Sequence, residues 1–104
     1  MNYTNPDKSQ SKGQVPEEGN NSALNLSADT LVKAGPGRLM RVSVITAGSA
    51  VGAVHDSATI AGASSANQVG TIPNTVGTTI FNWPCLAGIV YKVGTGQAVS
   101  ISFA

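Results

Sequence analysis

Few residues of this chain carry side chains that could do acid–base, nucleophilic or metal chemistry. The sequence holds one histidine, one cysteine and five carboxylates in 104 residues. His55 and Asp56 are adjacent, and they are the one base and carboxylate that stand together. Neighbouring side chains on a strand point to opposite faces, so this pair is not expected to act as a dyad. We interpret His55 as a hydrogen-bonded polar residue at a strand end or a subunit contact.

Carboxylates and metal ligands are equally scarce. Three of the five carboxylates lie among the first 22 residues, and only Asp29 and Asp56 follow. One histidine, one cysteine and two carboxylates form no cluster with the spacing of a metal site. The glycines beside Pro36 and Thr95 are not followed by a helix and a lysine at the spacing of a phosphate-binding loop. We therefore predict no catalytic residue, no metal and no cofactor, and we expect the protein not to be an enzyme.

The residues best suited to contact a partner include two arginines. Arg38 and Arg41 begin the most clearly alternating segment of the chain, and Lys33 is close in sequence. One interpretation is that they are solvated charges that discourage pairing at a sheet edge. The other is that they anchor the protein to an acidic patch on a partner. The sequence supports both interpretations equally.

Three aromatic residues complete the candidates for partner binding, namely Trp83, Tyr91 and Tyr3. Phe81 and Trp83 are two residues apart, so on a strand they share one face and serve as anchors in the core or at an interface. A receptor-binding surface would instead expose a cluster around Trp83, Tyr91 or Phe81. The aromatic residues lack basic neighbours other than Lys92, which argues against a stacking platform for single-stranded nucleic acid.

The low charge of the chain points to association with other chains. Charged residues make up 11% of the sequence, against roughly 25% in average soluble proteins. From Val42 to Ala104 only Asp56 and Lys92 carry a formal charge. Interspersed charge normally keeps soluble domains apart, so a surface this neutral favours assembly. We expect a component of a larger particle.

Other features of the composition exclude whole classes of partner. The six basic residues are scattered and the net charge is +1, which provides no basic face for nucleic acid. No run approaches the roughly 20 apolar residues of a membrane-spanning helix. The N-terminus shows no secretion signal, so we expect synthesis and folding in a cytoplasm. Cys85, the only cysteine, excludes an intrachain disulfide and is interpreted as a buried, unreactive side chain.

The first 22 residues differ from the rest of the chain. They are polar, contain two prolines and two glycines, and offer only three sizeable apolar residues. We predict a flexible N-terminal arm over 1–22 and one domain over 23–104. Such an arm either lies across a neighbouring subunit or is a tail without a role.

Beyond Ala23 the hydrophobic period is two, which indicates strands. In the clearest segment, Met40, Val42, Val44 and Thr46 are expected on one face, with Leu39, Arg41, Ser43 and Ile45 on the other. Pro36 and Gly37 signal a tight turn before this segment, and Pro84 signals a sheet edge or bend. The expected strands cover residues 24–34, 38–47, 53–56, 68–72, 77–84, 86–93 and 97–104.

Seven or so short strands without a helical period predict an all-β fold. We expect an antiparallel β-sandwich or jelly roll of about seven short strands with an extended N-terminal arm. An open barrel is the alternative.

The sequence pattern of the predicted domain resembles a known class of protein. The stretches "LVKAGPGRLMRVSVITAGSAVGAVHD" and "IPNTVGTTIFNWPCLAGIVYKVGTGQAVSISFA" resemble small virion proteins of tailed bacteriophages. The resemblance covers Leu24 to Ala104, rests on no catalytic fingerprint, and does not extend to residues 1–22. It implies an all-β module on the outside of the virion, as a head decoration (cement) protein or a head or tail fibre component.

The resemblance also implies partners and a location. The expected partners are the major capsid protein and other copies of the chain, with a homotrimer favoured, and neither nucleic acid nor a membrane is expected. The expected location is the virion, after synthesis in the cytoplasm of the bacterial host. The alternative is a fibre or spike component that binds a host surface receptor.

Overall fold

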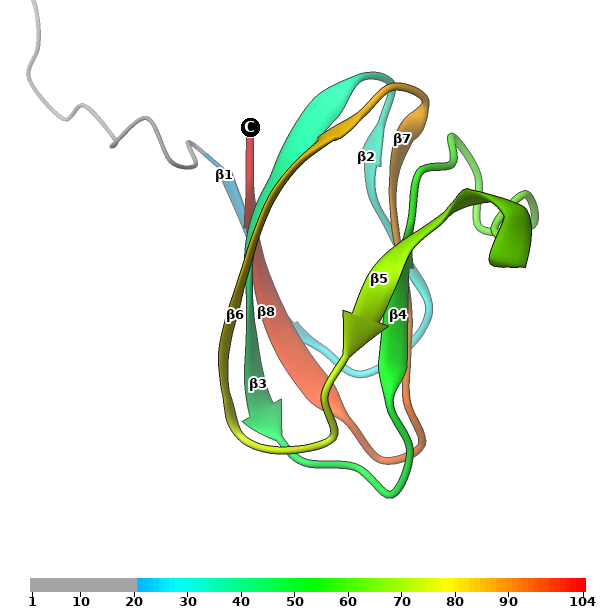
Figure 1. Cartoon of the computed structure of the whole chain (residues 1–104). Coiled ribbons are helices and arrows are strands. Elements are labelled where there is room, and N and C mark those ends of the chain that lie inside the picture. Colours follow the sequence, from blue (N-terminus) through cyan, green and yellow to red (C-terminus); the bar gives the residue numbers. More distant parts are fainter. Residues whose placement is uncertain (1–20) are drawn as a thin grey trace, which may run out of the picture.

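A computed structural model describes residues 21–104, which fold into two antiparallel four-stranded sheets packed face to face (Figure 1). The first sheet has the order β1-β8-β3-β6 and the second has the order β2-β7-β4-β5. The β-sandwich expected from the sequence is confirmed, with eight strands rather than about seven. Most of the predicted arm lies outside the described residues, although β1 already begins at Asn21.

The bounds of the strands follow the predicted segments closely. The first sheet consists of β1 (Asn21–Leu26), β8 (Ala98–Phe103), β3 (Gly37–Thr46) and β6 (Gly77–Cys85). The second consists of β2 (Thr30–Ala34), β7 (Gly88–Lys92), β4 (Gly52–His55) and β5 (Gln68–Ile72). Within residues 21–104 the one helix is the short 3-10 turn η1 (Ser65–Asn67), and no helix there could cross a membrane.

The core lies between the sheets and is built by the two-residue alternation of β3 and β8. Val42 is paired with Ile101 and Val44 with Val99, and all four side chains are buried. Leu39 is also buried, although it was expected on the opposite face from these valines. The pairing shifts between Leu39 and Arg41 on both sides of β3, and this bulge changes the face of one end of the strand.

The predicted strand over residues 24–34 is in fact two strands in different sheets. β1 pairs with β8 and β2 pairs with β7, and Ser27–Asp29 cross from one sheet to the other. The tight turn after β2 is confirmed, and Gly35 there has a φ of 97°, which favours glycine. The turn leads back into the first sheet, so β2 and β3 are consecutive but not paired.

The strand that contains Pro84 is an edge strand, as predicted. Among residues 21–104, β6 pairs only with β3 and has no neighbour on its other side. Proline lacks an N–H group, which is tolerated where one side of the strand has no partner. β6 therefore leaves one backbone edge of the first sheet open.

Candidate interaction surface on the first sheet

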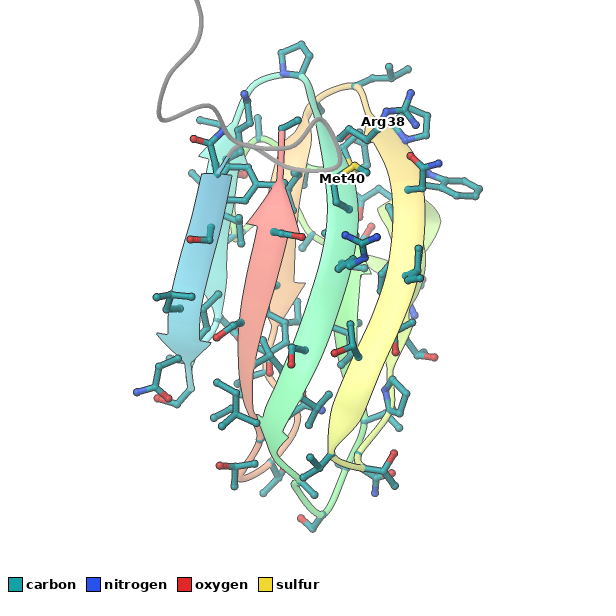
Figure 2. All side chains as sticks on the ribbon, turned by 90° about the vertical axis from the view of Figure 1, so that its left-hand side faces the viewer. Arg38 and Met40 are labelled. Atoms are coloured by element: carbon teal, nitrogen blue, oxygen red, sulfur yellow. The ribbon has the colours of Figure 1, made fainter. Side chains whose placement is uncertain are left out.

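The outer face of the first sheet carries short hydroxyl side chains opposite the core residues of the same strands. Figure 2 looks onto this face, with β1, β8, β3 and β6 side by side. One row across the sheet joins Ser22, Ser102, Arg41 and Ile80 through strand pairing. Because paired residues of antiparallel strands project to the same side, these four side chains share the outer face.

A second row lies one step along the strands and contains hydroxyl groups only. Ser100 is paired with Ser43, and Ser43 is paired with Thr78. The Thr78 hydroxyl donates to Ser43 Oγ at 3.4 Å, and the backbone N–H of Asn25 donates to Ser100 Oγ at 3.1 Å. The Ser102 hydroxyl is covered and has no hydrogen-bond partner among the described residues. It is the one buried side-chain oxygen or nitrogen that residues 21–104 leave without a partner.

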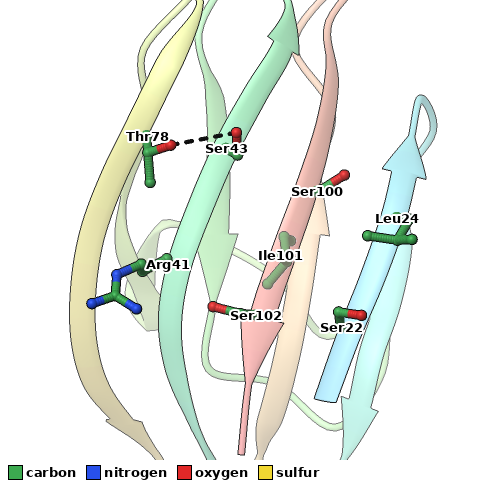
Figure 3. A pocket seen from close by; sticks show the side chains of 8 residues that line it. All are labelled: Ser22, Leu24, Arg41, Ser43, Thr78, Ser100, Ile101 and Ser102. Atoms are coloured by element: carbon green, nitrogen blue, oxygen red, sulfur yellow. Dashed lines mark hydrogen bonds between the residues drawn. The ribbon is translucent and has the colours of Figure 1, made fainter. Parts of the chain in front are cut away.

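The two rows surround a shallow depression of about 220 Å³ (Figure 3). Its floor and rim are mostly carbon, since short hydroxyl side chains contribute little polar surface. Figure 3 shows Arg41 on one flank, and Leu24 of β1 on the opposite flank. The lining residues are Ser22, Leu24, Arg41, Ser43, Thr78, Ser100, Ile101 and Ser102.

The two predicted arginines lie on β3, a central strand, so they do not protect a sheet edge by lying on it. The interpretation of both arginines as charges on an edge strand is therefore wrong, although Arg38 reaches the neighbouring edge strand β6. Arg38 donates from Nη1 to the carbonyl oxygen and to Oδ1 of Asn82 on β6, both at 3.3 Å. Arg41 is exposed beside the depression and makes no hydrogen bond to another described residue. As far as residues 21–104 are concerned, its guanidinium group can still bind a further carboxylate.

Large apolar side chains on this face and along β6 are exposed to solvent. Leu24 is 70% exposed, Ile80 is 68% exposed and Ile45 is about half exposed. Scattered apolar residues are ordinary on a protein surface, but a group on one face marks a contact surface. The sequence already contained the signal for this face, in the alternation of serine with core residues through β8.

The aromatic residues predicted to bind a partner differ in where the structure places them. Trp83 is 51% exposed at the edge of the first sheet, whereas Phe81 is partly buried and packs against the core. Asn82 between them has a φ of 49°, which breaks the expected alternation of the strand. Tyr91 was expected on a binding surface, but this expectation is wrong because the side chain is fully buried. Tyr3 lies outside the described residues.

Tyr91 is buried because its hydroxyl belongs to a polar network at one end of the core. The Tyr91 hydroxyl donates to Oε1 of Gln97 at 2.6 Å, and Gly94 donates its backbone N–H to the same oxygen. The Gln97 amide in turn donates to the carbonyl of Pro73 at 2.9 Å. Burial raises the pKa of the Tyr91 hydroxyl. Sequence reasoning missed Gln97, which follows a glycine-rich turn and carries no pattern of its own.

His55 and Asp56 face different partners, as the strand alternation predicts. The Nδ1 of His55 lies 2.8 Å from the carbonyl oxygen of Ser64 and 3.1 Å from Oδ1 of Asn67. Both partners are acceptors, so Nδ1 carries the proton and donates. The interpretation of His55 as a hydrogen-bonded residue at a strand end is therefore confirmed.

The Asp56 carboxylate accepts three backbone N–H groups at the turn between β6 and β7. The donors are Leu86 at 2.9 Å, Ala87 at 2.7 Å and Gly88 at 3.2 Å. Desolvation by burial raises the pKa of Asp56, but the three N–H donors together lower it further, so the pKa lies below its ordinary value. Asp56 is thus fully engaged in holding the turn.

The other carboxylate of the described part is engaged in the same way. The backbone N–H of Val93 donates to Asp29 at 2.9 Å, and Lys92 forms an ion pair with Asp29 at 3.0 Å. The Val93 hydrogen bond, followed by that from Lys92, lowers the pKa of Asp29. Both carboxylates therefore stabilise the fold, whereas Arg41 has no such task within residues 21–104.

Cys85 is buried, as predicted from its apolar neighbours. Desolvation by burial, with a smaller contribution from the nearby charge of Asp56, raises the pKa of the thiol to about 11. The thiolate is the reactive form of cysteine, so this side chain is inert at neutral pH.

The outer face of the first sheet therefore offers contact chemistry: aliphatic surface, hydroxyl groups that donate and accept, and one guanidinium group. Among residues 21–104 no group of three or more His, Cys, Asp or Glu side chains could hold a metal ion. Comparisons of the chain with protein-family models, with curated proteins and with solved structures each found no match.

Proposed function

We propose that this chain is a structural protein of a tailed-bacteriophage virion. In this proposal it is a capsid decoration (cement) protein that binds the outside of an assembled head as a homo-oligomer. Its partners are the major capsid protein and further copies of the chain, and the resemblance favours a trimer. The N-terminal segment takes part in attachment, and the protein acts after synthesis in the host cytoplasm.

The observation that carries this proposal is the bare outer face of the first sheet. Leu24 and Ile80 are exposed there among hydroxyl groups, and Arg41 is the single charged residue in the two rows. A neutral face with exposed apolar groups loses little on desolvation, because few charges have to leave water. The face is therefore well suited to lie against another protein in a permanent assembly.

A decoration protein stabilises a shell through mass action. It binds the assembled shell and not the free subunits, so each bound copy makes the shell harder to open. The affinity of a single contact can be modest, because attachment of one copy of an oligomer raises the effective concentration of the next. A small module without charge clusters is sufficient for this role.

The test is binding of the purified chain to phage heads that lack it, followed by a density map of the particles. We expect cosedimentation with heads and a two-sheet module on their outer surface. Arg41→Glu should weaken binding about tenfold or more by reversing the charge beside the depression. Lys33→Glu on the second sheet is the matched control and should bind normally. Heads that never carry the chain would overturn the proposal.

Exposure of Trp83 favours a second candidate function, a fibre or spike component that binds a host surface receptor. The indole is half exposed at a sheet edge, and a tryptophan in that position is a common anchor for a glycan or a protein. Under this alternative, Trp83→Ala lowers adsorption to host cells and leaves head stability unchanged. Density at the tip of a fibre, rather than on the head, would favour this candidate over decoration.

A further inference from the structure

In the part of the chain that the structure describes, the two sheets have four open edges, and β6 forms the longest of them. β6 has nine residues, while β1 has six and β2 and β5 have five each. An edge strand presents a row of unpaired backbone N–H and C=O groups that can pair with another chain. Native proteins usually protect such edges with charges, prolines or bulges. The segment from Val76 to Leu86 contains no charged residue.

One half of β6 is protected and the other half is not. Around Asn82 the positive φ distorts the strand, and Arg38 donates to the Asn82 carbonyl. Pro84 has no N–H group to offer. Apart from Gly77, whose φ is 148°, none of these features occurs in this half, and the strand pairs with β3 in regular register from Gly77 to Ile80. From Thr78 to Phe81 this half retains an unblocked backbone edge.

Exposed apolar side chains accompany this edge. Of the nine large apolar residues that are exposed in the described part, four lie on β6 or directly beside it. They are Val76, Ile80, Trp83 and Leu86. A chain that paired with β6 would cover apolar surface in addition to the backbone groups.

The other three edges are less suited to pairing. β1 has an irregular register and a φ of 54° at Asn25. β2 carries the charged Lys33 and also has an irregular register. β5 exposes no large apolar side chain. Leu24 is the one exposed large apolar residue on β1, and Leu31 is the one on β2. Within residues 21–104, β6 therefore combines the longest edge with the most exposed apolar residues.

We propose that Gly77–Phe81 of β6 pairs antiparallel with the same segment of a second copy. The two first sheets then form one continuous sheet about a two-fold axis. The proposal deepens the self-association within the proposed function and rests on that part of it alone. It replaces the trimer, which the resemblance implies, with a two-fold pair.

A second copy is the occupant that the charges favour. Two identical antiparallel edges are self-complementary, since each donor on one strand meets an acceptor on the other. The pairing segment has no charge that would repel its own copy. The cations nearest the pairing segment are Arg38, which donates to Asn82 of β6, and Arg41, which lies opposite Ile80 on β3. With strands about 4.8 Å apart, the two β3 strands are about 14 Å apart, beyond the Debye length of about 8 Å.

The first test measures the mass of the full chain by light scattering over a range of concentrations. We expect a mass of two chains for the native protein and at least a tenfold weaker dimer for Ile80→Lys. Ile45→Lys is the matched control, because Ile45 is also exposed on the first sheet but lies on the central strand β3, and it should dimerise normally. Circular dichroism verifies that both variants are folded. A mass of one or three chains, or equal weakening by both variants, would overturn the proposal.

The second test locates the contact by cysteine crosslinking. Thr78→Cys, Thr79→Cys and Ile80→Cys are made singly, and at least one should form a disulfide dimer on oxidation, because one position lies near the two-fold axis. Thr71→Cys on the exposed side of β5 is the control and should remain uncrosslinked. Absence of crosslinking by all three β6 variants, or equal crosslinking by the control, refutes this pairing.

Head binding separates this inference from the proposed function. If the native chain dimerises through β6 and never binds phage heads, the inference stands and the virion role fails. If single chains bind heads and no β6 pairing is found, the virion role stands and the inference fails.

Discussion

Within residues 21–104, a loop covers part of the outer face of the second sheet, whereas no segment covers the outer face of the first sheet. His55 and Val90 are paired on the outer side of the second sheet, and both are buried. The His55 ring donates to Ser64 and Asn67, which fastens the loop after β4 over this side. The corresponding place on the first sheet carries short hydroxyl groups, exposed aliphatic residues and Arg41 (Figure 2).

The two sheets also differ in whether their polar side chains have hydrogen-bond partners. On the second sheet and its loops, Asp29, Asp56, Gln97 and Tyr91 all have hydrogen-bond partners that hold strands and turns together. On the first sheet, the Ser102 hydroxyl and the Arg41 guanidinium have none among the described residues. Within the described residues, these polar groups of the second sheet and its loops are therefore paired, whereas two on the outer face of the first sheet are not.

The largest expected effect is on stability, from Gln97→Leu at the end of the core. Leucine leaves the Tyr91 hydroxyl, the Gly94 N–H and the Pro73 carbonyl without the partners that Gln97 supplies. We expect a loss of about 3 kcal/mol in the free energy of unfolding, because each unpaired buried group costs about 1–3 kcal/mol. Urea denaturation measures it. A loss below about 1 kcal/mol would contradict the structural role of this network.

A somewhat smaller loss is expected for Asp56→Asn. The amide side chain lacks the negative charge that accepts the N–H groups of Leu86, Ala87 and Gly88. We expect about 2 kcal/mol of destabilisation, which is the range for hydrogen bonds to a charged group. Amide hydrogen exchange should show faster exchange at these three N–H groups. Unchanged exchange there would show that the carboxylate does not hold the turn.

Acid should weaken the contacts that the carboxylates of Asp29 and Asp56 make around the second sheet. The folded-state pKa values of Asp29 and Asp56 lie below the ordinary 3.8, so their contribution is complete above that pH and is lost as the pH falls through the lowered values. We expect the urea midpoint of the native chain to fall more steeply below about pH 4 than that of the Asp29→Asn, Asp56→Asn double variant. Parallel curves for the two proteins would exclude this linkage.

The smallest effect is expected on the bare face. Ser43→Ala removes only the 3.4 Å hydrogen bond from Thr78 on an exposed side of the sheet. We expect a change in unfolding free energy within about 0.5 kcal/mol, as is usual for surface substitutions. A loss as large as that of Asp56→Asn, measured under the same conditions, would abolish the distinction between the two regions.

The strands and the core could be predicted because they depend on local pattern. The alternation in β3 and β8 places Val42, Val44, Val99 and Ile101 inside without knowledge of the partner strand. Burial of Cys85 and the edge position of Pro84 also followed from chemistry close to each residue. These predictions needed only the period of two and the missing N–H of proline.

The failures occurred where the backbone departs from regular alternation or where distant segments meet. The bulge at Met40 buries Leu39, and the left-handed Asn82 separates the surroundings of Phe81 and Trp83. Tyr91 was placed on a surface because its hydroxyl partner, Gln97, lies across a turn and has no recognisable motif.

The sequence by itself determined the all-β class, the approximate strand bounds and the low charge of the surface, because these depend on residue types and their short-range spacing. The tertiary structure decided which strands are edges and which face remains bare. It also decided which polar groups have partners. These properties depend on pairings between residues far apart in the chain, such as Ser22 with Ser102, and no local pattern specifies such a pairing.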